Sequence, residues 1–402
     1  MDIKARQASS TASLTRSAAL RFVLLIGIVS FFADMTHEGA RGITGPFLAS
    51  LGASATIVGI VVGLGELLGY GLRLVFGYFT DRTRQYWPIA LVGYAINLGA
   101  VPLLALAGNW PVAALLMIAE RSGRAMRTPA RDAMISHASG ELGSGWVFGV
   151  REALDAAGAM LGPLSVAGVL ATRGSFQDAF AILVIPVLLT FIVLIISVRL
   201  YPRPHDLETR PPLRVADRFP PVYWVYLAAM GLIAAAFADY PLIAYHFSVA
   251  HVFSTDVIPI LYAVAMGTEA VAALVLGRMF ARIGLSTVVG ATLLPACFAP
   301  LVFLGSAPLA VLGMICWGLG AATQESIVKA AITGMINPSQ RATAYGLFDT
   351  GFGICWFLGS VILGILYDHS VIGLVVFSVT LQLAAIPVLI WTRQRLARLH
   401  EA

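Results

Sequence analysis

The stretch YPRPHDLETRPPLRVADRFPP, residues 201–221, divides the chain into two halves of similar length. It is rich in proline and charge, whereas the sequence on either side is strongly apolar. A segment of this composition is typical of a linker rather than of a membrane span. Of the 402 residues, 58% are hydrophobic and 12% are charged, against roughly 25% charged in an average soluble domain. The composition therefore indicates an integral membrane protein.

Apolar segments lie on both sides of this linker, each near the ~20 residues that a helix needs to cross a bilayer. Before the linker we expect spans at 19–47, 54–77, 87–106, 110–134, 146–171 and 177–199. After it we expect spans at 222–248, 255–279, 285–304, 308–335, 342–366 and 370–391. The predicted fold class is an all-α polytopic membrane protein with 12 transmembrane helices in two pseudo-symmetric six-helix bundles.

Arginine is concentrated in alternate connections and at the C-terminus, whereas the intervening loops carry a single arginine, Arg173. The positive-inside rule then predicts that both termini and the linker are cytoplasmic, in a multi-pass protein of the cell inner (cytoplasmic) membrane. No cleavable signal is expected in the polar N-terminal residues. The predicted units are a tail at 1–18, bundles at 19–199 and 222–391, a linker at 200–221 and a tail at 392–402.

Internal similarity relates the two halves. The tripeptide FAD occurs at residues 32–34 and again at 237–239, in the first and seventh expected spans. GVREALDAAGAMLGPL, from Gly149, aligns with GLFDTGFGICWFLGSV, from Gly346, which pairs Gly162 with Gly359. The same alignment pairs Glu152 with Asp349. Such repeats are typical of duplicated transporters, in which the substrate path lies between the repeats.

The first span carries an unusual charged stripe in FFADMTHEGARG, residues 31–42. Asp34, His37, Glu38 and Arg41 share one face at helical pitch. Because a charge at the bilayer centre costs at least ~2.5–3.5 kcal/mol, this face must contact something other than lipid. We expect it to line a cavity that carries protons and substrate.

The fourth span carries charges in ERSGRAMRTPARD, residues 120–132, and its arginines recur at steps of three and four. For Arg127 and Arg131, snorkelling to the interface is an alternative to substrate contact. Arg121 lies too deep for that and requires an acidic partner. Candidate partners in the first half are Asp34, Glu38, Glu66, Glu152 and Asp155.

The second half has fewer ionisable residues in its spans, so we expect the first half to carry the coupling chemistry. Static ion pairs that fix helix packing are the alternative. The predicted substrate and proton pathway is Asp34, His37, Glu38, Arg41, Glu66, Arg121, Arg127, Arg131, Glu152, Asp155, Asp239, Glu325 and Lys329.

Between the second and third spans stands GYFTDRTRQYW, residues 77–87, which resembles the G-x-x-x-D-R-x-x-R signature of the major facilitator superfamily. In the second half, GRMFARIG at 277–284 is similar but has Ala281 in place of the acid. The resemblance implies a cytoplasmic gate that latches the two halves, and a solvated turn is the alternative. The gate residues implied are Gly77, Asp81, Arg82 and Arg84.

The fifth span is similar to the G-x8-G-x3-G-P pattern of antiporters in that superfamily, through Gly149, Gly158, Gly162 and Pro163. It departs from the full pattern where Val166 and Ala167 replace two glycines. The resemblance implies export, whereas plain small-residue helix packing is the alternative.

In the fourth span, Arg121 matches an arginine that the resemblance links to proton coupling.

The resemblance implies a two-bundle carrier, which we expect to be a proton-coupled secondary transporter that exports a small organic solute by H⁺ antiport through alternating access. Proton symport of an organic anion and metal-cation transport through Asp34, His37 and Glu38 are alternatives. A non-transporting sensor or scaffold is a further alternative. No phosphate-binding G-x-x-x-x-G-K-[ST] loop is present, and HEGAR lacks the second histidine of a zinc hydrolase. We expect no enzyme activity, no cofactor, no resident metal and no nucleic-acid partner. The expected partners are protons, a small-molecule substrate and the lipid bilayer. The expected oligomeric state is a monomer.

Overall fold

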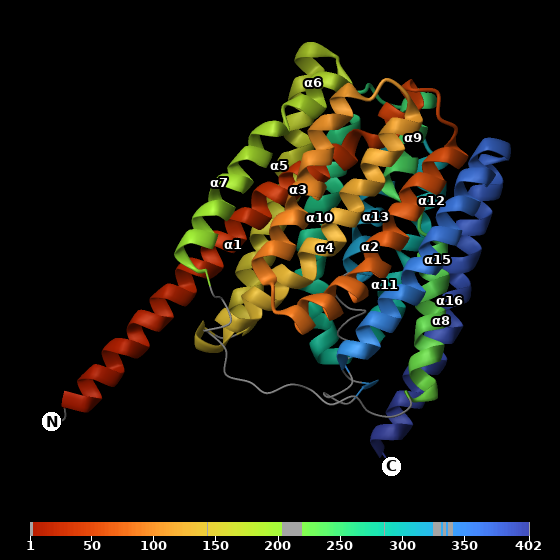
Figure 1. Cartoon of the computed structure of the whole chain (residues 1–402). Coiled ribbons are helices and arrows are strands. Elements are labelled where there is room, and N and C mark those ends of the chain that lie inside the picture. Colours follow the sequence, from red (N-terminus) through yellow and green to blue (C-terminus); the bar gives the residue numbers. More distant parts are fainter. Residues whose placement is uncertain are drawn as a thin grey trace.

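The computed structural model is helical throughout most of the residues that it describes, which are 3–142, 144–202, 219–284, 286–324, 331–332, 335–336 and 341–401. The N- and C-terminal ends of the chain lie at the same end of the molecule (Figure 1). We call this end the terminal face and the opposite end the distal face.

The helices before the linker follow the expected spans closely. They are α1 (Ile3–Ser50), α2 (Ala55–Thr83), α3 (Tyr86–Leu103), η1 (Leu104–Leu106), α4 (Trp110–Leu142), α5 (Ser144–Arg173), α6 (Phe176–Ala181) and α7 (Val184–Leu200). Helix α1 begins at Ile3 and so extends through most of the expected tail at 1–18, whereas its membrane-crossing part begins at Ser17. Helix α2 begins where the Ser54 side chain accepts a hydrogen bond from the Ile57 backbone N–H, and it ends at Arg84 in the left-handed conformation.

Two expected spans after the linker are broken into shorter helices. The helices of this half are α8 (Pro221–Ala236), α9 (Tyr240–Val249), α10 (Ile258–Ile283), α11 (Ser286–Leu293), η3 (Pro295–Cys297), α12 (Phe298–Phe303), α13 (Ala307–Ala322), α15 (Arg341–His369) and α16 (Val371–Glu401). The span expected at 222–248 is interrupted between Ala236 and Tyr240, and that at 285–304 becomes α11, η3 and α12. Proline at 295 removes a backbone donor at the second break.

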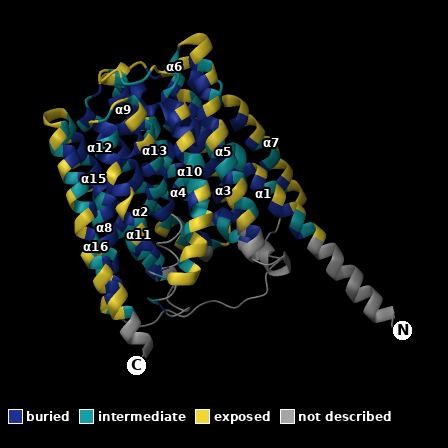
Figure 2. Ribbon diagram, turned by 180° about the vertical axis from the view of Figure 1, so that it is seen from behind, coloured by how far each residue is buried: buried dark blue, intermediate teal, exposed yellow. Residues whose placement is uncertain are grey.

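Within the described residues, ten helical segments are long and apolar enough to cross a membrane. Helix α4 is long but heavily charged, and α13 is apolar but shorter, with 16 residues. The expected count of twelve spans therefore stays a prediction. Large apolar side chains are exposed at helical spacing on the outside of the molecule, as on α7 at Ile185, Leu188, Ile192 and Ile195 (Figure 2). This is the surface that lipid would cover.

The internal repeat predicts a packing contact that the structure contains in both halves. A Cβ atom added to Gly162 on α5 would collide with the backbone of Met35 on α1. A Cβ atom added to Gly359 on α15 would collide with the backbone of Ala235 on α8. The aligned glycines thus let the equivalent helices of each half approach closely. Gly158 packs on α1 in the same way, at Phe31.

The two halves meet closely at the distal face. A Cβ atom on Gly45, near the distal end of α1, would collide with the Pro241 carbonyl of α9. The Asp368 carboxylate, at the distal end of α15, accepts hydrogen bonds from the Ala55 and Thr56 backbone N–H groups at 3.1 and 2.9 Å. It thereby caps α2, which belongs to the other half. Helices from both halves also share one continuous hydrophobic core, whereas the terminal end of the first half has its own.

Candidate functional site

The charged stripe of α1 lies in the interior of the protein. Asp34, His37 and Glu38 are buried, and the Arg41 side chain is 16% exposed. Helices α4 and α5 pack along α1 in the first half, and α9 packs on its distal part. The expectation that this stripe faces protein rather than lipid is therefore confirmed.

The charged face of α4 supplies most of the partners for α1. Arg127 and Arg131 are buried, with side chains 1% and 6% exposed. Snorkelling to the interface is therefore wrong for both residues: α4 turns them into the helix packing rather than toward its end. The Arg127 guanidinium lies over the Tyr94 ring, 4.6 Å from its centroid, and 3.6 Å from Asp34 Oδ1. Arg131 contacts its neighbour Asp132 at 2.9 Å.

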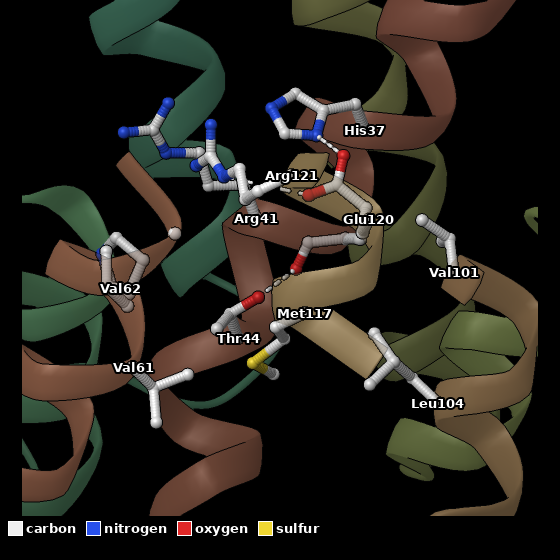
Figure 3. Close-up of a pocket in the computed structure, with 13 residues that line it drawn as sticks. His37, Arg41, Thr44, Val61, Val62, Val101, Leu104, Met117, Glu120 and Arg121 are labelled. Carbon is white, nitrogen blue, oxygen red and sulfur yellow. Dashed lines mark hydrogen bonds and ion pairs between the residues drawn. The ribbon is translucent and has the colours of Figure 1, made fainter. Parts of the chain in front are cut away.

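His37 and Glu120 form the tightest contact between α1 and α4. Their Nδ1 and Oε1 atoms are 2.7 Å apart, and the two side chains point at one another (Figure 3). Glu120 also accepts a hydrogen bond from Asn97 of α3 at 2.5 Å. The other ring nitrogen of His37, Nε2, is 3.6 Å from Glu38 Oε1 and has no hydrogen-bond partner. A single imidazole thus lies between two carboxylates.

Arg41 joins the two halves of the protein. Its Nη2 atom lies 2.5 Å from Asp239 Oδ1, at the break between α8 and α9, and 3.5 Å from Glu66 Oε1 on α2. Glu66 is also 2.9 Å from Arg121 Nη2, so the acidic partner that Arg121 requires is present. Tyr262 of α10 makes a second link between the halves, because its hydroxyl donates to Glu38 at 2.5 Å.

A small cavity of about 40 Å³ lies beside this network, on its distal side. Its polar side is formed by His37, Arg41, Glu120 and Arg121, and Figure 3 shows these groups above an apolar floor. The floor is formed by Val61, Val62, Val101, Leu104 and Met117. A polar space of this size has room for a few water molecules. The arrangement can hold water against a chain of carboxylates and an imidazole.

The predicted pathway residues are only partly brought together. The network contains Asp34, His37, Glu38, Arg41, Glu66, Arg121, Arg127 and Asp239, whereas Arg131 lies toward the terminal face. Asp155 pairs with Arg151 of its own helix at 2.9 Å, and Glu152 is exposed on α5. Glu325 and Lys329 lie outside the described residues. Their roles in transport stay predictions.

Three residues of the network had no role predicted from sequence. Glu120 and Arg124 belong to the charged face of α4, and Arg124 Nη1 lies 3.6 Å from Glu38 Oε1. Their helical spacing relative to Arg121 and Arg127 is the sequence feature that could have predicted their place in the network. Tyr262 is one tyrosine in an apolar span, and its contact with Glu38 depends on how the halves pack.

The gate and glycine motifs lie where the spans predict. Gly77 lies near the terminal end of α2, where an added Cβ would be 3.7 Å from Pro129 of α4. Arg82 is exposed and donates to Tyr78, and the side chain of Asp81 lies outside the described part. In the glycine motif Gly158 and Gly162 contact α1 while Gly149 faces open space. Pro163 is accommodated inside α5.

Comparison with known proteins identifies the class. The family model described as Major Facilitator Superfamily matches residues 23–360 of this chain. An uncharacterized protein of Mycobacterium tuberculosis is 38% identical over 388 residues, covering 94% of this chain and 95% of that protein. An uncharacterized MFS-type transporter of Methanocaldococcus jannaschii is 28% identical, covering 87% of this chain and 89% of that protein.

Solved transporters have the same fold. The nucleoside transporter NupG superposes with a TM-score of 0.69 at 14% identity, covering 93% of this chain and 98% of that chain. The peptide transporter POT, in complex with sulfate, superposes with a TM-score of 0.75 at 13% identity, covering 94% of this chain and 95% of that chain. The chain belongs to the Major Facilitator Superfamily. It is a multi-pass membrane transporter and not an enzyme.

Proposed function

We propose that this protein is a proton-coupled secondary carrier that works by alternating access and exports a small organic solute in exchange for protons. In this proposal the terminal face is cytoplasmic, as the arginine distribution indicates. The molecule spans the membrane twelve times as two related six-helix bundles, with α4 and the segment that begins with α13 completing the count.

The observation that carries the proposal is the contact of Arg41 with Asp239 and Glu66. Arg41 belongs to α1 of the first half, and Asp239 belongs to the second half, so this ion pair exists while the halves meet distally. Neutralising one carboxylate by protonation removes part of the attraction that holds Arg41. A proton can therefore favour separation of the halves at the distal face.

The close distal contacts support the assignment of this structure to a distally closed state of the proposed cycle. Gly45 against Pro241 and Asp368 against the start of α2 both join the halves on the distal side. With the terminal face in the cytoplasm, the carrier is closed to the exterior. Protons entering from outside would then meet the His37, Glu120 and Arg41 groups as that side opens.

Export is supported by the resemblance of the α5 glycine motif to the pattern of antiporters in the superfamily, and the packing of this motif bears on coupling rather than on direction. Gly158 and Gly162 bring the α5 backbone against α1, the helix that carries the charged stripe. Movement of α5 is thereby coupled to Asp34, His37 and Arg41 through direct backbone contact. Pro163 lacks a backbone donor, so α5 can bend at this contact.

A second candidate is import of an organic anion by proton symport. It is favoured by the guanidinium groups of Arg41, Arg121 and Arg124, whose side chains are 16%, 13% and 23% exposed and so are not fully enclosed by carboxylates. Metal-cation transport has less support, because the described residues contain no group of three or more His, Cys, Asp or Glu placed to hold a metal ion.

Proton flux in proteoliposomes tests the coupling. A library of organic solutes is first screened by thermal shift on the purified protein, and solutes that bind are tested for movement of protons with a lumenal pH dye. We expect Asp239→Asn to lower the solute-dependent proton flux about tenfold or more. Asp239→Glu should retain a larger share of the wild-type flux, because it keeps the carboxylate. Asp178→Asn, in an exposed pair with Arg173, is the matched control and should leave the flux unchanged.

The sign of the flux separates the two candidates. Protons that move against the solute indicate antiport, and protons that move with it indicate symport. Solute transport without proton movement would refute the coupling, and full flux in Asp239→Asn would refute the role of the Arg41 contact.

A further inference from the structure

One ring nitrogen of His37 has no hydrogen-bond partner in the interior of the first half. The residue is 3% exposed, and its Nε2 atom is buried without a partner. A buried polar atom in this condition is costly and requires an explanation. The group that faces Nε2 is Glu38, whose Oε1 atom is 3.6 Å away. A carboxylate oxygen is an acceptor, so a proton on Nε2 is what the two groups can share.

The contacts of Glu120 decide which nitrogen of His37 carries the proton of the neutral ring. Asn97 Nδ2 donates to the Glu120 backbone carbonyl at 2.9 Å and to Glu120 Oε1 at 2.5 Å. Rotating the Asn97 amide would set its oxygen against both acceptors, so its orientation is fixed. Glu120 Oε1 therefore acts as an acceptor, and His37 Nδ1 donates to it across 2.7 Å. In the neutral ring, Nε2 then carries only a lone pair.

The same ring borders the cavity of about 40 Å³ on the distal side of the network. His37 and Glu120 lie together at the polar side of this space (Figure 3). A water molecule that enters it can donate to the ring while the ring is neutral. Water in the cavity is also the donor from which a proton reaches the ring. The cavity therefore gives His37 a source of protons away from lipid.

The charges around His37 favour one additional proton. In the described residues, ion pairs here join five carboxylates to four guanidinium groups: Asp34, Glu38, Glu66, Glu120 and Asp239 with Arg41, Arg121, Arg124 and Arg127. With a neutral ring this network carries one excess negative charge, and a proton on the ring balances it. Because uncompensated buried charge is costly, the balance favours the imidazolium ring.

We propose that the coupling proton binds at Nε2 of His37, so that the imidazolium ring donates to Glu120 through Nδ1 and to Glu38 through Nε2. A hydronium ion in the cavity gives up the proton and leaves a water molecule, while the ring gains one positive charge. The inference rests on the proposed proton coupling and adds to it a titrating group one turn of α1 away from Arg41.

Glu38 connects this ring to the second half. Its Oε2 atom accepts from the Tyr262 hydroxyl at 2.5 Å, and its Oε1 atom lies 3.6 Å from Arg124 Nη1 as well as from His37 Nε2. Protonated His37 competes with Tyr262, because it draws the carboxylate toward Nε2. Tyr262 moves away with the second half when the distal side opens. The open state therefore holds the proton more strongly, and the proton favours opening.

The other neighbours of the ring set how strongly the closed state opposes the proton. The guanidinium groups of Arg41, Arg121 and Arg124 disfavour a positive charge on His37. Toward α5 and α7, a Cβ atom added to Gly39 would meet Gly162 and Leu183, which do not titrate. Attraction from the carboxylates and repulsion from the guanidinium groups thus nearly cancel at the ring. The position of Glu38 then decides whether the proton is held.

Labelling of a buried distal cysteine tests the inference without any solute. Leu48→Cys, in a background without the native cysteines, is treated with a membrane-impermeant thiol reagent in the full-length protein in lipid nanodiscs. Its rate is divided by that of Thr255→Cys, which is exposed between α9 and α10. We expect this ratio to rise about fivefold from about pH 8 to pH 6, the range in which histidine titrates.

Three variants assign this dependence on pH. His37→Gln should abolish it, and His251→Gln, at an exposed distal position, is the matched control and should keep it. Glu38→Gln covers the case in which His37→Gln does not fold. It retains an acceptor for Tyr262 but removes the carboxylate that faces Nε2, so it should reduce the dependence on pH.

Two results would overturn the inference. One is a wild-type ratio that does not change with pH, which leaves a cavity water as the partner of Nε2. The other is a dependence on pH that survives His37→Gln and Glu38→Gln and is lost in His246→Gln, whose ring contacts the Tyr367 hydroxyl at 3.0 Å. Asp239→Asn should keep the dependence on pH whatever its proton flux, so failure of the Arg41 contact and failure of the His37 site are distinguishable.

Discussion

The interior of the first half is built around charged side chains, whereas the interior of the second half is built around aromatic rings. In the first half, Asp34 pairs with Arg127 and Glu120 pairs with His37, and all four residues are buried. In the second half, the rings of Tyr240 and Tyr262 stack with centroids 4.1 Å apart, close to Trp317. Among the described residues of that half, Asp239 is the one buried carboxylate.

The difference shows which features the two halves share and which they do not. Both halves keep the glycine contact between equivalent helices, at Gly162 and Gly359. The side chains around these two glycine contacts differ: in the described residues, buried ion pairs surround the contact at Gly162, whereas aromatic and aliphatic side chains predominate in the second half. The charged half contacts the aromatic half through Arg41 with Asp239 and through Glu38 with Tyr262.

The largest expected effect comes from removing a buried charge in the first half. Arg127→Ala would leave Asp34 with Arg124 at 4.0 Å and would remove the contact with the Tyr94 ring. We expect a loss of about 3–5 kcal/mol in the free energy of unfolding, because a buried carboxylate loses its nearest cation. Chemical or thermal unfolding of the purified protein measures it.

A double variant distinguishes charge from volume. Asp34→Asn combined with Arg127→Ala should be less destabilised than the sum of the single changes. Arg173→Ala, whose side chain is 68% exposed, should change stability little. If the losses of unfolding free energy in the two single variants simply add up to the loss in the double variant, charge pairing does not distinguish the first half from the second.

An intermediate effect tests the feature that the halves share. Gly162→Ala and Gly359→Ala each place a methyl group against the backbone of a neighbouring helix, so each should cost about 1–3 kcal/mol of unfolding free energy. Gly149→Ala, which faces open space, should be neutral or slightly stabilising. A large loss in one half and none in the other would show that the packing has diverged as the chemistry has.

The smallest expected effect concerns a contact that joins the halves. Asp368→Asn removes the negative charge that caps α2, which is worth about 1 kcal/mol. We therefore expect the equilibrium constant between the distally closed and distally open states to shift roughly fivefold toward the open state. The readout is the rate at which a membrane-impermeant thiol reagent modifies Leu48→Cys, a buried distal position, in a background without the native cysteines.

The matched control for this experiment is Asp178→Asn, which changes an exposed carboxylate in the first half. It should leave the labelling rate at Leu48→Cys unchanged. An unchanged rate in Asp368→Asn as well would mean that the capping contact does not help to hold the distal side closed.

Local sequence features predicted much of the fold and part of the site. Apolar run length predicted most spans within a few residues, since the bilayer sets the length of a crossing helix. Helical spacing predicted that Asp34, His37 and Arg41 share a buried face. The breaks after Ala236 and Leu293 were not predicted, because hydropathy is continuous through both positions.

The sequence by itself determined that the protein is a membrane protein and that it carries a charged stripe, because each depends on composition or on spacing along one helix. The division at 201–221 and the repeat stay predictions from the sequence. The tertiary structure alone decided the partners: Glu120 for His37, Asp239 for Arg41 and Tyr262 for Glu38. These contacts join residues from different helices. Which helices meet is set by packing over the whole molecule, and no local pattern records it.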